Sequence, residues 1–182
     1  YKGRESEVNL AFQSAYELSE DALIDLDVNY ALISRKDVAV EAKPRSLFTV
    51  TPSYSFVIMD ELKLQVGFTA AFENDSIDSK SAHVYPMAKA SYPISPAVDL
   101  EASLSGGIEK VSWQSLVAEN LWLAPNVPVF HSNKSFDFGA GIRAKLGNQV
   151  FTQAGLSFSS IKNLYSFVNL PQDQSKFAVV YD

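Results

Sequence analysis

The feature that most constrains the fold is a set of long segments in which apolar and polar residues alternate. One of them is "VDLEASLSGGIEKVSW", residues 98–113. Its apolar positions are Val98, Leu100, Ala102, Leu104 and Ile108. A period of two predicts a β-strand with one apolar and one polar face. A strand in a globular protein has about five or six residues, so an environment that requires unusually long strands must be found.

Alternation recurs along the whole chain. The other segments are 7–14, 22–32, 47–58, 62–72, 82–92, 136–146 and 150–160, and a last one starts at 176–182. Both amphipathic faces and β-branched or aromatic residues are typical of strands. The sequence therefore predicts an all-β protein with about nine strands.

The connections between these segments alternate in length. The short ones are 16–21, 59–61, 93–97 and 147–149, and the long ones are 33–46, 73–81, 114–135 and 162–175. In an antiparallel up-and-down sheet, all short turns then lie at one rim and all long loops at the other. Short periplasmic turns and long external loops are typical of outer-membrane barrels.

A lipid bilayer accounts for the length of the strands. A tilted membrane-spanning strand needs about 9 to 11 residues, and a sheet in lipid has to close because its edges find no water. Bacterial barrels generally have an even number of strands. We therefore expect residues 1–182 to be a single, partial region of a larger antiparallel up-and-down transmembrane β-barrel. The alternative is a soluble barrel or sandwich with its apolar face inward.

Composition excludes several other classes of protein. A net charge of -6 gives no basic footprint for nucleic acid. The absence of cysteine excludes disulfides and thiolate metal sites. No apolar run reaches the roughly 20 residues of a transmembrane helix, and "YKGRESEVNL" lacks the layout of a signal peptide. A membrane-spanning protein with this sequence would have to be a barrel.

Several stretches carry a family resemblance. They are "HVYPMAKASYPI" (83–94), "DLEASLSGGIEKVSW" (99–113), "SLVAENLWLAP" (115–125), "FDFGAGIRAKLGNQVFTQAGLSFSSIKNLYSFVN" (136–169) and "FAVVYD" (177–182). From about Pro44 onward the chain resembles the barrel region of TonB-dependent-receptor-like outer-membrane proteins of Gram-negative bacteria. The resemblance implies an outer-membrane location and uptake of a substrate, or service within an outer-membrane assembly.

The chain has two histidines as candidates for chemistry. His83 is expected on the lumen side of its strand, and His131 in the long loop before the next one. Barrel enzymes that act on lipids combine His and Ser, and Ser81, Ser91 and Ser132 lie near the histidines in sequence. We interpret this proximity as incidental and expect neither an enzyme nor a catalytic residue.

Two pairs of carboxylates are spaced at i and i+2, so each pair points to one face of the sheet. They are Asp25 with Asp27 and Asp99 with Glu101. The same polar face is expected to hold Lys63, Lys89, Arg143 and Lys145. We interpret the carboxylates as lumen lining, with no bound cofactor.

Three acidic residues, Glu73, Asp75 and Asp78, lie in the loop "ENDSIDSK". Oxygen ligands of this kind bind calcium, but the spacing is not that of an EF-hand. We expect a solvated loop without a metal.

Gly106 and Gly107 are predicted to mark a bulge or bend. Tyr16, Phe72, Tyr92 and Phe136, near the ends of the apolar rows, are candidates for interfacial girdles.

The loop Ser115 to Phe130 is unusually apolar. Either it enters the barrel mouth or contacts another outer-membrane protein, or it packs on the neighbouring segment 163–171.

Two functions remain for this chain. One is a transport or receptor-like barrel in the outer membrane, whose partner is the lipid bilayer. The other is a structural or accessory barrel subunit of an outer-membrane complex.

Overall fold

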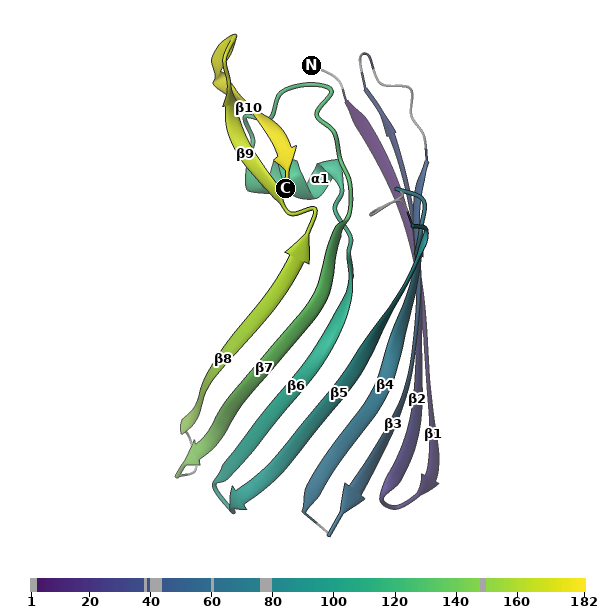
Figure 1. Ribbon diagram of the computed structural model, residues 1–182, viewed down its shortest axis with the longest axis vertical. Helices are drawn as coiled ribbons and strands as arrows, with labels where there is room; N and C mark the ends of the chain where they lie inside the picture. The colour runs from purple at the N-terminus through teal and green to yellow at the C-terminus, as the bar shows by residue number, and fades with distance from the viewer. Residues whose placement is uncertain (1–2, 38, 40–43, 60, 76–79, 148–149) are drawn as a thin grey trace.

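The protein forms one large antiparallel sheet. The computed structural model describes residues 3–37, 39, 44–59, 61–75, 80–147 and 150–182. The sheet has eight strands in chain order (Figure 1). They are β1 (Arg4–Ser19), β2 (Ala22–Lys36), β3 (Arg45–Ile58), β4 (Leu62–Glu73), β5 (Ala82–Ser95), β6 (Val98–Glu109), β7 (Ser132–Leu146) and β8 (Val150–Lys162). The predicted up-and-down order is confirmed.

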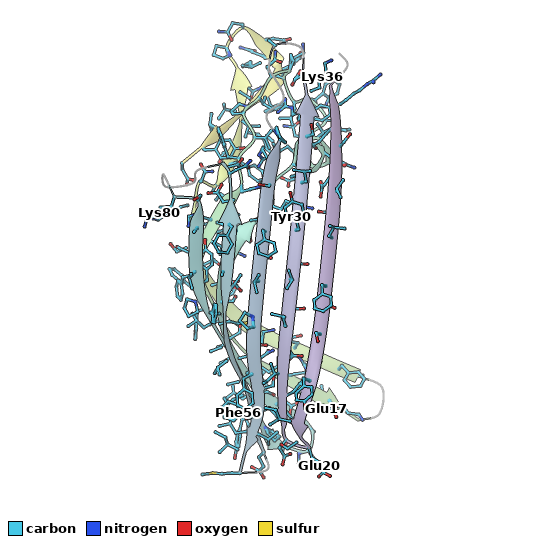
Figure 2. All side chains as sticks on the ribbon, turned by 90° about the vertical axis from the view of Figure 1, so that its right-hand side faces the viewer. Glu17, Glu20, Tyr30, Lys36, Phe56 and Lys80 are labelled. Atoms are coloured by element: carbon cyan, nitrogen blue, oxygen red, sulfur yellow. The ribbon has the colours of Figure 1, made fainter. Side chains whose placement is uncertain are left out.

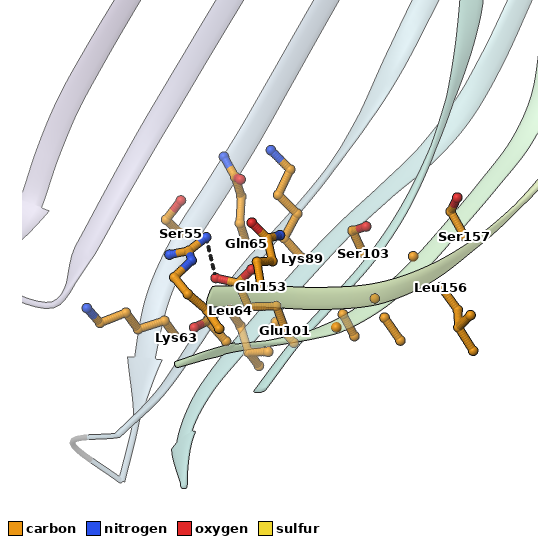
Figure 3. A pocket seen from close by; sticks show the side chains of 18 residues that line it. Ser55, Lys63, Leu64, Gln65, Lys89, Glu101, Ser103, Gln153, Leu156 and Ser157 are labelled. Carbon is orange, nitrogen blue, oxygen red and sulfur yellow. Dashed lines mark ion pairs between the residues drawn. The ribbon is translucent and has the colours of Figure 1, made fainter. Parts of the chain in front are cut away.

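The register assigns the two faces of the sheet by residue parity. Even-numbered residues pair with even-numbered ones from β1 to β8, as in Leu10 with Tyr30 and Phe138 with Phe158. Because side chains alternate along each strand, the even residues share one face, which is apolar. The odd residues share the other, which is polar. The sheet bends into an open trough, and the odd-numbered polar face is the concave one (Figures 1 and 3).

The alternation of connection lengths is also confirmed. The tight turns that join β1 to β2, β3 to β4, β5 to β6 and β7 to β8 gather at one end, and the long connections gather at the other (Figure 1). In Figure 2, Glu17 and Glu20 mark the turn end, and Lys36 and Lys80 mark the loop end. The two ends of the trough therefore differ in what covers them.

The end of β6 departs from the prediction. The strand stops at Glu109, and the register shifts between Ser105 and Gly107, which confirms the predicted bulge. The extra residue reverses the direction of the side chains. Ile108 was expected in the apolar row of Leu104, and this is wrong. It lies 9% exposed in a cluster on the concave face with Ala31, Leu47, Ala71 and Tyr85.

The expected ninth barrel strand is also wrong. After β8, Asn163 adopts a positive φ of 57° and donates its side-chain amide to the carbonyl oxygen of His131 at 2.7 Å. The chain therefore leaves the sheet and forms a separate hairpin, β9 (Tyr165–Leu170) and β10 (Asp173–Tyr181). β9 lies in what was expected to be a long loop. Between β6 and β7, the chain forms the short helix α1 (Trp113–Glu119).

The sheet remains open. Across the described ranges, no strand pairs with the outer edges of β1 and β8. The architecture is therefore an antiparallel up-and-down sheet that is consistent with part of a barrel. No helix among the described residues is long and apolar enough to cross a membrane.

Candidate functional site

The concave face contains a polar hollow near the turn end of the sheet. Its cavity volume is about 690 Å³. Two rows of paired residues cross it from β4 to β8. One row is Lys63, Ser91, Glu101, Gly141 and Gly155, and the other is Gln65, Lys89, Ser103, Gly139 and Ser157. Figure 3 shows Lys89, Ser103 and Ser157 on one side of the sheet and Leu156 pointing to the opposite side.

The hollow depends on the glycines of β7 and β8. A Cβ atom on Gly141 would lie 2.9 Å from the carbonyl oxygen of Ala154, and one on Gly155 would lie 2.9 Å from that of Ala140. A Cβ on Gly139 would lie 2.9 Å from the hydroxyl oxygen of Ser103. These positions therefore leave the space between the longer side chains of β4 to β6 empty. The volume falls within the range of small-molecule sites, about 300 to 1,000 Å³.

The predicted lumen residues occupy this face. The carboxylate of Glu101 accepts a hydrogen bond from the guanidinium of Arg143 at 2.7 Å (Figure 3). Asp99 is paired with Arg143 in the register of β6 and β7. Asp25 and Asp27 share the concave face on β2, outside the hollow. The prediction that both pairs lie on the polar face is confirmed.

The loop end of the trough is crossed by a structure that we call the cap, residues 110–131 together with the β9–β10 hairpin. The chain leaves β6, crosses the concave side and reaches β1 and β2. The carboxylate of Glu5 accepts from the backbone N–H groups of Trp113 and Gln114 at 3.0 and 2.8 Å. Lys110 forms an ion pair with Glu7. The cap therefore joins strands that lie far apart in the sheet.

Further contacts fix the cap to β2. The guanidinium of Arg35 donates to the carbonyl oxygen of Val127 at 2.7 Å and lies 5.6 Å from the ring centre of Trp113. The backbone N–H of Asn126 donates to the carboxylate of Asp37 at 3.0 Å. These contacts are made by side chains and by the backbone of the cap, and they do not replace the backbone pairing of β1 with β2.

A buried charge cluster lies at the base of the cap. Arg45 holds the carboxylate of Asp75 through Nε at 2.9 Å and Nη2 at 2.7 Å. The same Nη2 donates to Nδ1 of His131 at 2.9 Å, and the backbone N–H of Val111 donates to that nitrogen at 3.1 Å. The His131 side chain is 0% exposed. Since Nδ1 accepts two hydrogen bonds, the histidine is neutral and carries its proton on Nε2.

This environment shifts both ionisations. Burial lowers the pKa of His131 to about 4, and the positive charge of Arg45 adds to the effect. Burial alone would raise the pKa of Asp75, but the hydrogen bonds and charge of Arg45 outweigh it, so the pKa lies below the ordinary 3.8. The cluster therefore has a neutral histidine beside an ion pair at neutral pH.

Acidification is expected to loosen the cap. Between pH 6.5 and about 4, unfolded His131 binds a proton that the folded form does not, so stability falls as pH falls through this window. Asp75 contributes only below its ordinary pKa of 3.8. Amide hydrogen exchange of residues 110–131, corrected for intrinsic rates, is expected to accelerate from pH 7 to 4.5. His131→Gln should abolish this acceleration. If the variant accelerates as the wild type does, a group other than His131 causes the acid response.

Neither histidine is paired with a serine in the part of the chain that the structure describes. Nε2 of His83 lies 3.5 Å from a carboxylate oxygen of Glu73. The hydroxyl of Ser132, next to His131, donates to the carbonyl oxygen of Asn163 at 3.0 Å. Ser91 lies in the row of the distant hollow. The arrangement that a His-activated serine requires is therefore not formed among these residues.

Asp75, in the described part of the acidic loop, is buried against the cap. The Asp75 carboxylate binds Arg45 and accepts from the backbone N–H of His131 at 2.9 Å. Asp78 lies outside the described residues. Among the residues that are described, no group of three or more His, Asp or Glu side chains is arranged to hold a metal ion. The interpretation of this loop as merely solvated is wrong for Asp75, because Arg45 brings it to the interior.

The apolar loop Ser115 to Phe130 packs largely on the β9–β10 hairpin. Leu116, Ala124, Val127 and Val129 form a cluster with Val179 of β10. Tyr165, Phe167 and Leu170, which lie in the neighbouring segment 163–171, pack against this cluster. Of the two alternatives left open by the sequence, packing on the neighbouring segment accounts for these side chains.

Comparisons with known proteins support the fold. No family model matches the sequence, and no curated protein does. Among solved structures, the chain is similar to the FrpB iron transporter from Neisseria meningitidis (F3-3 variant), with a TM-score of 0.65 and 13% sequence identity. The match covers 98% of this chain and 31% of that chain. The present chain thus spans about a third of the transporter, and the similarity concerns the architecture of the sheet.

Proposed function

We propose that this chain is part of an outer-membrane β-barrel that transports a solute, of the TonB-dependent-receptor-like kind. The observation that carries the proposal is the separation of charge between the two faces. Charged residues at even-numbered positions of the strands occur only at the loop end: Arg4, Lys36, Lys134 and Lys162, of which the last two lie beyond a register shift. Since a charge in contact with lipid is costly, the even-numbered face is suited to the bilayer and the polar face to a lumen.

Aromatic residues on the even-numbered face support this assignment. Phe48 and Phe72 pair near the loop end with ring centres 6.1 Å apart, and Tyr54 stacks on Phe56 near the turn end at 5.1 Å. From Phe48 to Phe56 the strand rises about 27 Å, or about 20 Å in height at the tilt of such barrels. This is close to the apolar band of about 25 Å between the girdles of outer-membrane barrels.

The arrangement also suggests an orientation. Short turns face the periplasm in bacterial barrels, so the hollow would lie at the periplasmic end and the cap at the external end. A solute path through the trough would then be closed on the outside by the cap. The similarity to an iron transporter supports transport as the class of function, and iron is named as the solute of FrpB alone.

An accessory role in an outer-membrane complex is the second candidate. Leu121 and Trp122, within the loop Ser115 to Phe130, remain 79% and 67% exposed. Exposed apolar side chains of this kind mark interaction sites. This role predicts a filled lumen without conductance, and loss of a co-purifying outer-membrane protein when both residues are changed to serine.

Conductance in planar bilayers tests the transport proposal. The full protein that carries this chain would be compared with the variant Glu5→Ala/Arg35→Ala, which removes contacts between the cap and the strands. We expect this variant to show longer or more frequent openings than the wild type. Arg4→Ala/Glu20→Ala is the control, because it also removes one charge of each sign but leaves the cap contacts intact. Absence of conductance in all three proteins would contradict an open transport path and favour the accessory role.

A further inference from the structure

Two lysines in the hollow have no anionic partner. Lys63 and Lys89 form no ion pair and no hydrogen bond with any of the residues that the structure describes. Both line the hollow on its concave side. Lys36 and Lys80, by contrast, lie at the loop end of the sheet (Figure 2). Both lysine side chains are exposed to solvent, but they border the same hollow of the concave face.

The register places the two lysines side by side. Lys63 on β4 is paired with Ser91 on β5, and Lys89 is two residues from Ser91 on the same strand. Such diagonal neighbours on one face lie about 7 to 8 Å apart. This spacing is that of the backbones, and the two side chains point in different directions in Figure 3. Both side chains are long and exposed, so rotation about their side-chain bonds would bring both ammonium groups to one anionic group.

The nearest carboxylate is already occupied. Glu101 is a diagonal neighbour of Lys89 in the register of β5 and β6. Its carboxylate, however, binds Arg143 at 2.7 Å. With Glu101 compensated by Arg143, Lys63 and Lys89 leave the hollow with an excess of two positive charges.

Neutral polar groups and free space complete the site. The hydroxyls of Ser91 and Ser103 lie in the rows of the two lysines, and Gln65, whose amide donates to Ser53 at 2.9 Å, also lines the hollow. Gly139 and Gly141 leave the opposite side of the hollow unfilled. A molecule of small-ligand size fits a cavity of about 690 Å³.

We propose that this hollow binds a small anionic solute through Lys63 and Lys89, with carboxylate or phosphate groups as the moieties recognised. The proposal deepens the transport function by naming the chemical class of the solute. Ammonium groups bind both anions through charge-assisted hydrogen bonds. The Glu101–Arg143 pair would border the site and keep Arg143 from adding a third free cation.

Calorimetric titration of the full protein in detergent tests the site. The probes are citrate and inorganic phosphate, at low ionic strength because salt screens exposed charges. We expect Lys63→Gln/Lys89→Gln to weaken the binding of at least one probe by about tenfold or more, which corresponds to the loss of one charge-assisted hydrogen bond. Lys36→Gln/Lys80→Gln removes the same charge at the loop end and should bind like the wild type.

The outcomes separate the site from the transport function, because binding is measured without conductance. Equal weakening in both double variants would reduce the effect to net charge and overturn the site. Absence of binding by the wild type would also overturn it. If the wild type does not bind, carbodiimide cross-linking tests one explanation. Attachment of Lys63 or Lys89 to a carboxylate other than Glu101 would show that an acidic protein segment, and not a solute, occupies the hollow.

Discussion

Leu104→Arg is expected to lower the free energy of unfolding in a lipid bilayer by about 2 to 4 kcal/mol. Leu104 lies on the even-numbered face, paired with Ala88 on β5 and Phe138 on β7. An arginine there would be placed among apolar side chains that face lipid in the proposed barrel. Reversible unfolding of the full protein in lipid vesicles, followed at increasing denaturant concentration, measures the difference.

The neighbouring residue is the matched control for this prediction. Ser103→Arg introduces the same side chain one residue earlier, on the concave face, where water can solvate its charge. Its effect is expected to stay within about 1 kcal/mol. A comparable loss at both positions, or a larger loss at Ser103, would refute the assignment of the even-numbered face to lipid.

Arg45→Met is expected to open the cap. The side chain of Asp75 is only 4% exposed, and Arg45 is the charge that compensates it. Removal of one partner from a buried pair typically costs about 3 to 5 kcal/mol, because the remaining charge is left without compensation. His131 loses one of the two donors to Nδ1 as well. Hydrogen exchange of the cap amides should report this loss as a lower free energy of local opening.

Two further variants separate the mechanism from a general effect of substitution. In Arg45→Met/Asp75→Asn neither member of the buried ion pair is charged, so a part of the lost protection should return. Lys36→Met removes an exposed cation at the same end of the sheet and should leave exchange unchanged. A double variant as unprotected as Arg45→Met would show that packing of the arginine, and not compensation of Asp75, stabilises the cap.

The strands were predictable because their cause is local. An alternation of apolar and polar residues assigns each side chain to a face within the strand itself, and the register then preserves this assignment from β1 to β8. The prediction failed where one extra residue at a bulge shifts the alternation of side chains between the two faces. Ile108 follows a bulge, so its parity no longer gives its face. The hairpin β9–β10 was missed because a positive φ at Asn163 redirects the chain.

The hollow and the cap differ in how far the sequence predicts them. Lys63, Lys89 and Arg143 were expected on the polar face from alternation alone. Arg45 was not singled out, although it organises the cluster under the cap. Its partners Asp75, Val111 and His131 lie 30, 66 and 86 residues away in sequence, so no local pattern connects them. The acidic sequence around Asp75 predicts a solvated loop. Only the contact with Arg45, which the sequence does not predict, shows that this carboxylate is buried.

The cap also supplies an optical signal. The chain has two tryptophans, Trp113 and Trp122, and both belong to the cap: one lies under the guanidinium of Arg35, and the other is exposed at the surface. The eight strands of the sheet contribute none. Tryptophan emission from this chain therefore reports on the cap alone, and its opening can be followed in real time without attaching a dye.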